Sequence, residues 1–345
     1  MTVSTIMENE YDITVIICTY NRCDLLSEAL ESVLSQDADE IRYELIVVDN
    51  NSTDDTKSLI ASFLSRGYPN FRYIFEAKQG LSNARNAGLA NARAPLIAFT
   101  DDDVRVARDW VRAIKRTFDE HPEVDYLGGK VLPRWNVEPP PWLTGEHWSA
   151  LALQDHGETS FYSNDARPTC LVGANLALRR ELLPLVGNFD PAFARIGASS
   201  SDDHEWQLRV WNFGRQGLYA PQVVVTADVQ VERMSKAYHR LWHTGHGVSC
   251  AMMRDPTCER GSARLFGVPA PLFREAARHA LGLVKHTVRR DEASALISEG
   301  YLRWFRSFYR HRRADYLATH QGGTITEVAT FVRSLVSAKM RSRPA

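Results

Sequence analysis

The sequence PLIAFTDDD occupies residues 95–103 and decides the fold class. It begins with a short apolar run, which a threonine and three aspartates follow at once. An apolar run of this length is typical of a strand that is buried on both faces of a parallel sheet. Three further strands are predicted before it: ITVIIC at 13–18, ELIVV at 44–48 and FRYIF at 71–75.

Helical patterns separate these strands. Apolar residues recur at helical spacing over 25–34, and further helices are predicted over about 54–65 and 80–92. The alternation predicts an α/β fold with a doubly wound, mostly parallel sheet flanked by helices. Ligands of such sheets bind outside the carboxyl ends of the strands. Because Asp49 and Asp101–Asp103 directly follow strands, we expect them to line one crevice.

Composition and charge describe an ordinary globular protein with a basic end. The chain has 345 residues, of which 44% are apolar and 24% are charged, and its formal net charge is −1. This charge gives no reason to expect a nucleic-acid partner. From Arg254 onward, however, 17 Lys and Arg residues face 8 Asp and Glu residues, so the remainder of the chain is acidic.

Cysteine usage and hydropathy indicate in which cellular compartment the protein is found. The cysteines have no CxxC spacing, which argues against a disulfide framework and against a structural zinc knuckle. The N-terminus is polar and acidic, unlike a secretory signal. No apolar run approaches the roughly 18 residues of a membrane helix. We expect a cytoplasmic protein that can lie on the inner face of a membrane but does not span it. The five cysteines are Cys18, Cys23, Cys170, Cys250 and Cys258.

Three consecutive carboxylates at the end of a strand repel one another, and a divalent cation is the usual remedy. Hard oxygen ligands of this kind suit Mg²⁺ or Mn²⁺. A solvated acidic turn is the simpler alternative.

A long irregular stretch over 133–166 contains several Pro and Trp residues, including Trp142, and suggests a wall or lid for a substrate.

Four blocks of sequence resemble the signature blocks of family-2 glycosyltransferases with the GT-A fold. They occur in the family's order over residues 13 to about 225, which makes the resemblance specific. The blocks are ITVIICTYNR (13–22), LIVVDNNSTDDT (45–56), GLSNARNAGLANARAPLIAFTDDDV (80–104), and LVGANLALRRELLPLVGNFD (171–190) together with SDDHEWQLRV (201–210).

The resemblance implies a nucleotide-sugar donor and a divalent metal, Mn²⁺ or Mg²⁺. It places the nucleotide base against Thr19 and Asp49, and the ribose near Asp101. Asp103 would bind the metal that bridges the diphosphate, which stabilises the leaving group as the sugar–phosphate bond breaks. The residues implied in nucleotide-sugar binding are Thr19, Tyr20, Asn21, Asp49, Arg85, Asp101 and Asp102. For Arg85 the alternative is a surface arginine on an amphipathic helix.

The second acidic pair implies the chemistry. Asp203 matches the family's general base, which would take the proton of the acceptor hydroxyl in an inverting displacement. Asp202 stands where the family usually has Glu, and with Glu205 it fits a helix-capping box. On the acceptor side we expect Trp142, Asn175 and Asp202.

The chain departs from the family pattern at the third metal ligand. The family often has a His after the last sheet strand, whereas Ala227 and Asp228 occupy those positions here. Asp228 is therefore the expected substitute ligand. His243 and His246 follow nearby, and either contact the diphosphate or pack as ordinary helix histidines.

A stripe of aromatic residues recurs at helical spacing near the C-terminus, and arginines fill the remaining faces of the predicted helix. Such a helix either lies in an anionic membrane interface or docks on the protein. Membrane contact would suit a glycan or polyprenyl-linked acceptor, a kind of acceptor that members of the family commonly use. The stripe consists of Tyr301, Trp304, Phe305, Phe308 and Tyr309.

We therefore expect three regions: a GT-A nucleotide-sugar-binding and catalytic domain over 1–228, a lid or connector over 229–260, and a basic helical region over 261–345. Two other functions stay open. One is a sugar nucleotidyltransferase on a related sheet, although the first strand lacks the Gly-rich loop of such enzymes. The other is a non-catalytic donor-binding module that has kept the fold and lost the chemistry.

Overall fold

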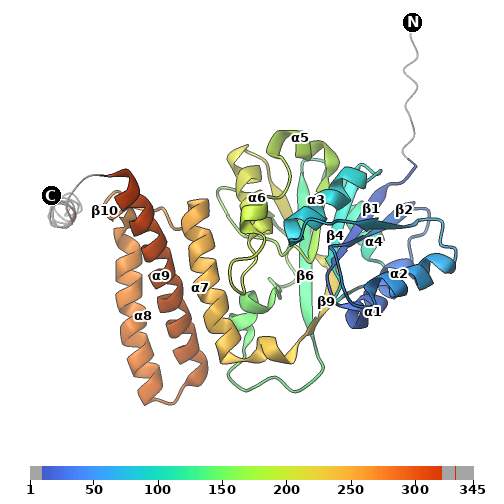
Figure 1. The fold of residues 1–345 in the computed structure, drawn as a ribbon. Helices are drawn as coiled ribbons and strands as arrows, with labels where there is room; N and C mark the ends of the chain where they lie inside the picture. Colours follow the sequence, from blue (N-terminus) through green and yellow to red (C-terminus); the bar gives the residue numbers. More distant parts are fainter. Residues whose placement is uncertain (1–9, 321–330, 332–345) are drawn as a thin grey trace, which may run out of the picture. The chain divides into compact units, whose positions relative to one another are not determined.

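The computed structural model describes residues 10–320 and residue 331, and it divides the chain into two compact units (Figure 1). The first unit contains the mixed sheet and its helices, and the second is helical. The first comprises the residues up to 138, 151–195 and 201–230, and the second comprises 139–150, 196–200 and the residues from 231 onward.

The sheet of the first unit is parallel in its N-terminal half and mixed beyond it. Within the described residues its strands follow the order β3-β2-β1-β4-β8-β6-β9-β5, with β7 paired to β9. The pairs β3–β2, β2–β1, β1–β4 and β6–β9 are parallel. The strands are β1 Ile13–Thr19, β2 Tyr43–Asp49, β3 Phe71–Phe75, β4 Leu96–Asp101, β5 Val104–Val106, β6 Tyr126–Trp135, β7 Phe161–Ser163, β8 Asn175–Arg179 and β9 Gly217–Val229.

Helices cover this sheet because its strands are apolar on both faces. β1 is buried along its whole length. On one face Ile16 and Ile46 join a core cluster that also contains Ala84 of α3 and Trp206 of α6. Helices α1 and α4 pack on β5 and β9. The helices are α1 Cys23–Leu34, α2 Thr56–Ser65, α3 Leu81–Asn91, α4 Trp110–Glu120, α5 Leu183–Val186 and α6 Asp202–Asn212.

Three long helices dominate the second unit, and α9 packs against both α7 and α8 (Figure 1). The aromatic stripe predicted for a membrane or a docking face lies mostly in this packing. Trp304 and Phe308 are buried in a cluster with Cys250 and Val268. The elements are the 3-10 helix η1 Gly145–Leu151, α7 Lys236–Met253, β10 Arg264–Leu265, β11 Val268–Pro269, α8 Ala270–Val288 and α9 Glu292–Thr319.

The predicted α/β architecture is confirmed, with element ends that differ by one or two residues. The irregular stretch over 133–166 contains more structure than its sequence indicates, since β6 runs into it and η1 and β7 lie within it. Helix α7, which falls in the expected connector, packs with α9 in the second unit. None of the helices in the described part of the chain combines the length and the apolar character needed to cross a membrane.

Candidate active site

Three predicted donor-site residues lie side by side at the carboxyl ends of parallel strands. Thr19 of β1 is paired in register with Asp49 of β2, and Cys18 of β1 is paired with Asp101 of β4. The apolar runs that precede these residues bury the strands and fix this register. The polar residues that were predicted to line one crevice therefore lie in one row at this edge of the sheet.

The turn after β1 is tied to the loop after β2. Asn21 adopts a left-handed backbone conformation with φ 51°, which Asn tolerates better than most residues. Its backbone N donates to Ser52 Oγ at 3.0 Å, and its Oδ1 accepts from Thr53 N at 2.7 Å. Tyr20, beside it, is 46% exposed. The two loops thus form one platform with an aromatic ring open to solvent.

Asp49 is buried at the base of this platform. Its Oδ1 accepts from Ser52 N at 2.9 Å, and its Oδ2 accepts from Tyr73 Oη at 3.2 Å. Helix α2 begins later, at Thr56, and its cap residue Asp55 makes no side-chain cap bond. Asp49 therefore orders the loop before α2 and does not cap the helix itself, although each carboxylate oxygen keeps a second lone pair for a ligand.

The three consecutive aspartates have different environments. The Asp101 side chain is 34% exposed, whereas Asp102 and Asp103 are buried. Arg22, from the turn after β1, lies 3.1 Å from Asp102 Oδ1 and 2.9 Å from Asp103 Oδ2. Burial raises the pKa of Asp102 to about 7, and the charge of Asp103 adds to this while Arg22 opposes it. Arg22 therefore supplies cationic charge to the cluster, a role that the sequence did not indicate.

Asp103 has a carboxylate oxygen that is suited to coordinate a divalent cation. Its Oδ2 takes both of its side-chain contacts, from Arg22 and from Gln230 Nε2 at 2.9 Å. Among the described residues no side chain donates to Oδ1, which leaves a hard oxygen for Mg²⁺ or Mn²⁺. The aspartates do not form a complete coordination shell by themselves, because no three of them bring oxygens within 4.8 Å of one another. A metal here would need donor diphosphate oxygens and water as further ligands.

Asp228 lies next to Asp103 in the sheet but is already neutralised. Its backbone N donates to Asp103 O at 2.8 Å. Its buried carboxylate is paired with Arg105 and, at 2.8 Å, with Arg134 Nε. A carboxylate held by two guanidinium groups is a poor candidate for a metal ligand, so this arrangement favours a structural role.

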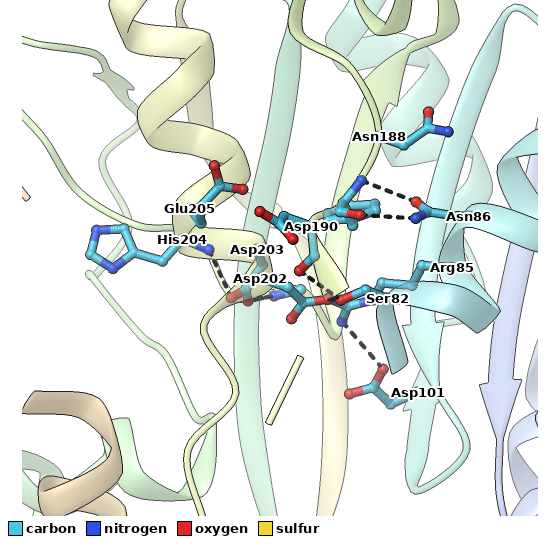
Figure 2. Close-up of polar contacts among 12 residues, drawn as sticks. Ser82, Arg85, Asn86, Asp101, Asn188, Asp190, Asp202, Asp203, His204 and Glu205 are labelled. Atoms are coloured by element: carbon cyan, nitrogen blue, oxygen red, sulfur yellow. Dashed lines mark hydrogen bonds and ion pairs between the residues drawn. The ribbon is translucent and has the colours of Figure 1, made fainter. Parts of the chain in front are cut away.

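Helices α3 and α6 meet through a buried ion pair (Figure 2). Arg85 Nη1 lies 3.0 Å from Asp202 Oδ2, which also accepts from Ser82 Oγ at 3.0 Å. Arg85 is 4% exposed and Asp202 is 0% exposed. Arg85 Nη2 also lies 4.0 Å from Asp101, which joins this pair to the end of β4. The alternative of a surface arginine is therefore wrong.

The capping-box interpretation of Asp202 is also wrong. Asp202 is the first residue of α6, the cap position belongs to Ser201, and no side-chain cap bond forms there. Glu205, the expected partner in the box, instead pairs with Arg209 at 2.8 Å. The physical reason is that Asp202 finds a buried arginine, which binds a carboxylate more strongly than a backbone N–H does.

Asp203 lies beside this pair, with its carboxylate and the Arg85 guanidinium both close to Gly173, and it is partly exposed. Its Oδ2 accepts from Gly173 N at 2.8 Å, and its Oδ1 accepts from His204 N at 2.8 Å. Desolvation raises the pKa of Asp203, the charge of Asp202 adds to this, and Arg85 opposes it. A fixed carboxylate with a raised pKa has the properties of a general base.

Two predicted acceptor-side residues have other surroundings. Asn175 is buried at the start of β8; its Oδ1 accepts from Trp110 Nε1 at 2.8 Å, and its Nδ2 donates to Lys130 O and Val223 O at 2.9 Å. Its hydrogen-bonding capacity is used inside the sheet. Trp142 belongs to the second unit, where its ring packs edge-on against His239.

The histidines of α7 pack within the second unit. His246 stacks on Trp242 with ring centroids 4.7 Å apart, and His243 packs against Gly300 of α9. Burial lowers the pKa of His243 to about 4. These contacts favour the packing alternative over contact with a diphosphate.

The chain is similar to known glycosyltransferases. Residues 14–183 match the model of Glycosyl transferase family 2. A glucosyl-dolichyl phosphate glucuronosyltransferase from Haloferax volcanii is 26% identical over 201 residues, covering 56% of this chain and 60% of the relative. Glycosyltransferase AglE from the same organism is 28% identical over 213 residues, covering 61% and 65%. The chain thus spans less than two thirds of the length of these curated relatives.

A solved structure shares the fold. The mannosyltransferase PcManGT from Pyrobaculum calidifontis, in complex with GDP-Man and Mn²⁺, superimposes with a TM-score of 0.52 at 22% identity. The match covers 95% of this chain and 81% of that one. Residues 14–183 thus form a glycosyltransferase family 2 domain, and the structure has the GT-A fold.

Proposed function

We propose that the chain is an inverting glycosyltransferase that moves a sugar from a nucleotide-diphosphate donor, most simply a UDP-sugar, to a hydroxyl acceptor. The observation that carries this proposal is the continuity of the site. The row of strand ends at Thr19, Asp49 and Asp101 is joined through Arg85 to α6, whose second residue, Asp203, offers a carboxylate. Donor-binding and proton-accepting groups thus belong to one polar network.

The platform after β1 and β2 would hold the nucleotide. Asp49 can accept the ring N–H of uracil through a remaining lone pair. Tyr20, which is exposed on the same platform, can stack on the base. Asp101, partly exposed at the next strand end, would accept hydrogen bonds from the ribose.

The diphosphate would lie over the buried aspartates. Asp103 would hold Mn²⁺ or Mg²⁺, and the ion would neutralise the charge that develops on the leaving diphosphate. Arg22 contributes a fixed positive charge between Asp102 and Asp103, which lowers the repulsion of the donor by this acidic cluster.

Asp203 would act on the acceptor. It would take the hydroxyl proton as the acceptor oxygen attacks the anomeric carbon, while the bonding electrons of the sugar–phosphate bond pass to the diphosphate. The hydrogen bonds from Gly173 N and His204 N fix the carboxylate. Attack from the face opposite the leaving group inverts the anomeric configuration, and no enzyme nucleophile is needed.

Contact with a membrane would use α8, not the aromatic stripe of α9. The exposed apolar residues of α8 are Leu281, Val284 and Val288, at 74%, 65% and 79% exposure. The exposed charged residues around them are basic and include Lys285 and Arg289. This face fits an anionic lipid surface, where a polyprenyl-linked glycan acceptor would be found.

Donor binding and turnover test the proposal in two steps. We expect a UDP-sugar with Mn²⁺ to raise the melting temperature of the full chain, because a ligand at 100 times its Kd adds about 2.7 kcal/mol of stability. GDP- and dTDP-sugars serve as comparisons. Wild-type protein should then hydrolyse the donor slowly in the presence of Mn²⁺, whereas Asp203→Asn should bind the donor without turnover. Asp119→Asn, at an exposed position of α4, is the matched control. Donor binding with no turnover by the wild type would instead support a non-catalytic module.

A further inference from the structure

The end of α7 and the turn after it bring Cys250 and Cys258 close together. Arg254 adopts a left-handed conformation with φ 53° and reverses the chain. Asp255 N then donates to Cys250 O at 3.5 Å, and Cys258 N donates to Asp255 O at 2.9 Å. As a result the two thiol sulfurs and a carboxylate oxygen of Asp255 all lie within 4.8 Å of one another. Cys250 is 2% exposed and Asp255 is 3% exposed, so this cluster is largely inside the protein.

Neighbouring groups orient these three side chains. Asp255 Oδ1 accepts from Thr257 N at 2.8 Å and from Thr257 Oγ1 at 2.7 Å. His246, one helical turn before Cys250, places its Nε2 3.5 Å from the Cys250 sulfur. Stacking on Trp242 fixes the plane of this imidazole. Hydrogen bonds and packing of this kind are how proteins orient the ligands of a metal.

We propose that Cys250, Asp255 and Cys258 form a zinc site, with His246 or a water molecule as the fourth ligand. Two thiolates, a carboxylate and an imidazole are all zinc ligands, at distances of about 2.0–2.3 Å from the ion in tetrahedral sites. In such a tetrahedron the donors lie roughly 3.5–3.8 Å apart, so the present cluster needs to contract by only about 1 Å. Soft thiolates distinguish this site from the oxygen site at Asp103, which suits Mg²⁺ or Mn²⁺.

A carboxylate beside two thiols points to a cation more than to a disulfide. Cys250 and Cys258 form no disulfide in the structure. A disulfide would use the sulfurs of Cys250 and Cys258 and would make no use of the adjacent carboxylate of Asp255. A divalent ion instead neutralises the carboxylate and the two thiolates together.

The position of the site indicates what the metal does. Cys250 also belongs to the apolar cluster that contains Val268 of β11 and Trp304 and Phe308 of α9. Zinc at this point would join the last turn of α7 to the segment that leads into α8. It would therefore stabilise the helical unit, because metal binding to the folded state adds to folding free energy.

Metal content of the full-length protein tests the proposal directly. We expect the wild type to retain about one zinc ion per chain after purification without chelator, as a structural site does. Removal of zinc with a strong chelator should lower the melting temperature. Replacement by Co²⁺ should give the charge-transfer absorption of a cobalt–thiolate bond.

Conservative variants separate ligands from bystanders. Cys258→Ser and Asp255→Asn should each reduce zinc content at least about tenfold, the effect of losing a primary or orienting ligand. Cys258 is the less buried thiol, so its serine variant is expected to fold. Cys170→Ser, which changes a partly buried thiol in the first unit, should keep the zinc. Wild-type protein that binds neither Zn²⁺ nor Co²⁺, a Cys250–Cys258 disulfide found by mass spectrometry, or equal zinc content in all three variants would each overturn the proposal.

Discussion

The buried pair of Arg85 and Asp202 makes the sharpest test of the site's architecture. Asp202→Asn removes one negative charge and little volume. If Asp202 were a helix cap, the change would be almost neutral, because Asn and Asp are similar caps. In the structure, however, Asp202 is fully buried and pairs with Arg85 at 3.0 Å. Breaking a buried pair by removing one partner costs about 3–5 kcal/mol, because the other charge is left uncompensated.

The structure places the expected cost near the lower end of this range. Asp101 lies 4.0 Å from Arg85 and stays to compensate part of its charge, so we expect about 3 kcal/mol. For a unit of this size that corresponds to a melting temperature lower by roughly 6–12 °C. The assay is thermal unfolding followed by a tryptophan signal. Glu120→Gln is the control, because its exposed i,i+4 pair with Arg116 is worth only about 0.3–0.5 kcal/mol.

A double-mutant cycle decides whether the pair itself is responsible. Arg85→Met with Asp202→Leu removes both buried charges, and such replacements of an ion pair are often neutral or stabilising. The double variant should therefore be more stable than Asp202→Leu alone, which is the matching single variant, with a coupling energy of about 2 kcal/mol or more. A loss below about 0.5 kcal/mol in Asp202→Asn, or strict additivity in the cycle, would show that the two side chains do not form the pair described here.

Three further outcomes are expected from the proposed function. Asp203→Asn should bind donor normally and lose transfer by at least about 10²-fold. A base must be deprotonated, and the pKa of Asp203 is raised. As the pH is lowered, the wild-type rate should therefore begin to fall at a higher pH than it would with an ordinary carboxylate as base. Asp103→Ala should abolish metal-dependent donor binding without unfolding, and activity that survives both this change and EDTA would remove the metal from the mechanism. The triple change Leu281→Ser, Val284→Ser and Val288→Ser should release the protein from anionic liposomes while leaving its melting temperature unchanged.

The fold could be predicted because its signal is local. Buried parallel strands are continuous apolar runs, and the polar residues that end them are adjacent in sequence, as in the step from Phe99 to Asp101. The register that aligns Thr19 with Asp49 follows from the same runs. These features need no knowledge of which distant residues meet.

The partners of the site residues could not be predicted in this way. Arg22 stands in a polar turn, and nothing in its neighbours indicates a contact with Asp102, which is 80 residues away. The capping interpretation of Asp202 used a local pattern, and a tertiary contact with Arg85 overrode it. Likewise, the spacing of Cys250 and Cys258 matches no zinc motif, and only the reversal at Arg254 brings them together.

Two adjacent aspartates at the start of α6 have different surroundings, because a helix turns by about 100° per residue. Asp202 points into the protein and neutralises Arg85, while Asp203 reaches Gly173 and solvent. Burial is the main cause of the raised pKa of Asp203; the charge of Asp202 adds to this effect and that of Arg85 opposes it. A raised pKa strengthens a carboxylate as a base. The ion pair therefore anchors the helix without weakening the proposed base, which a lone arginine at that distance would do.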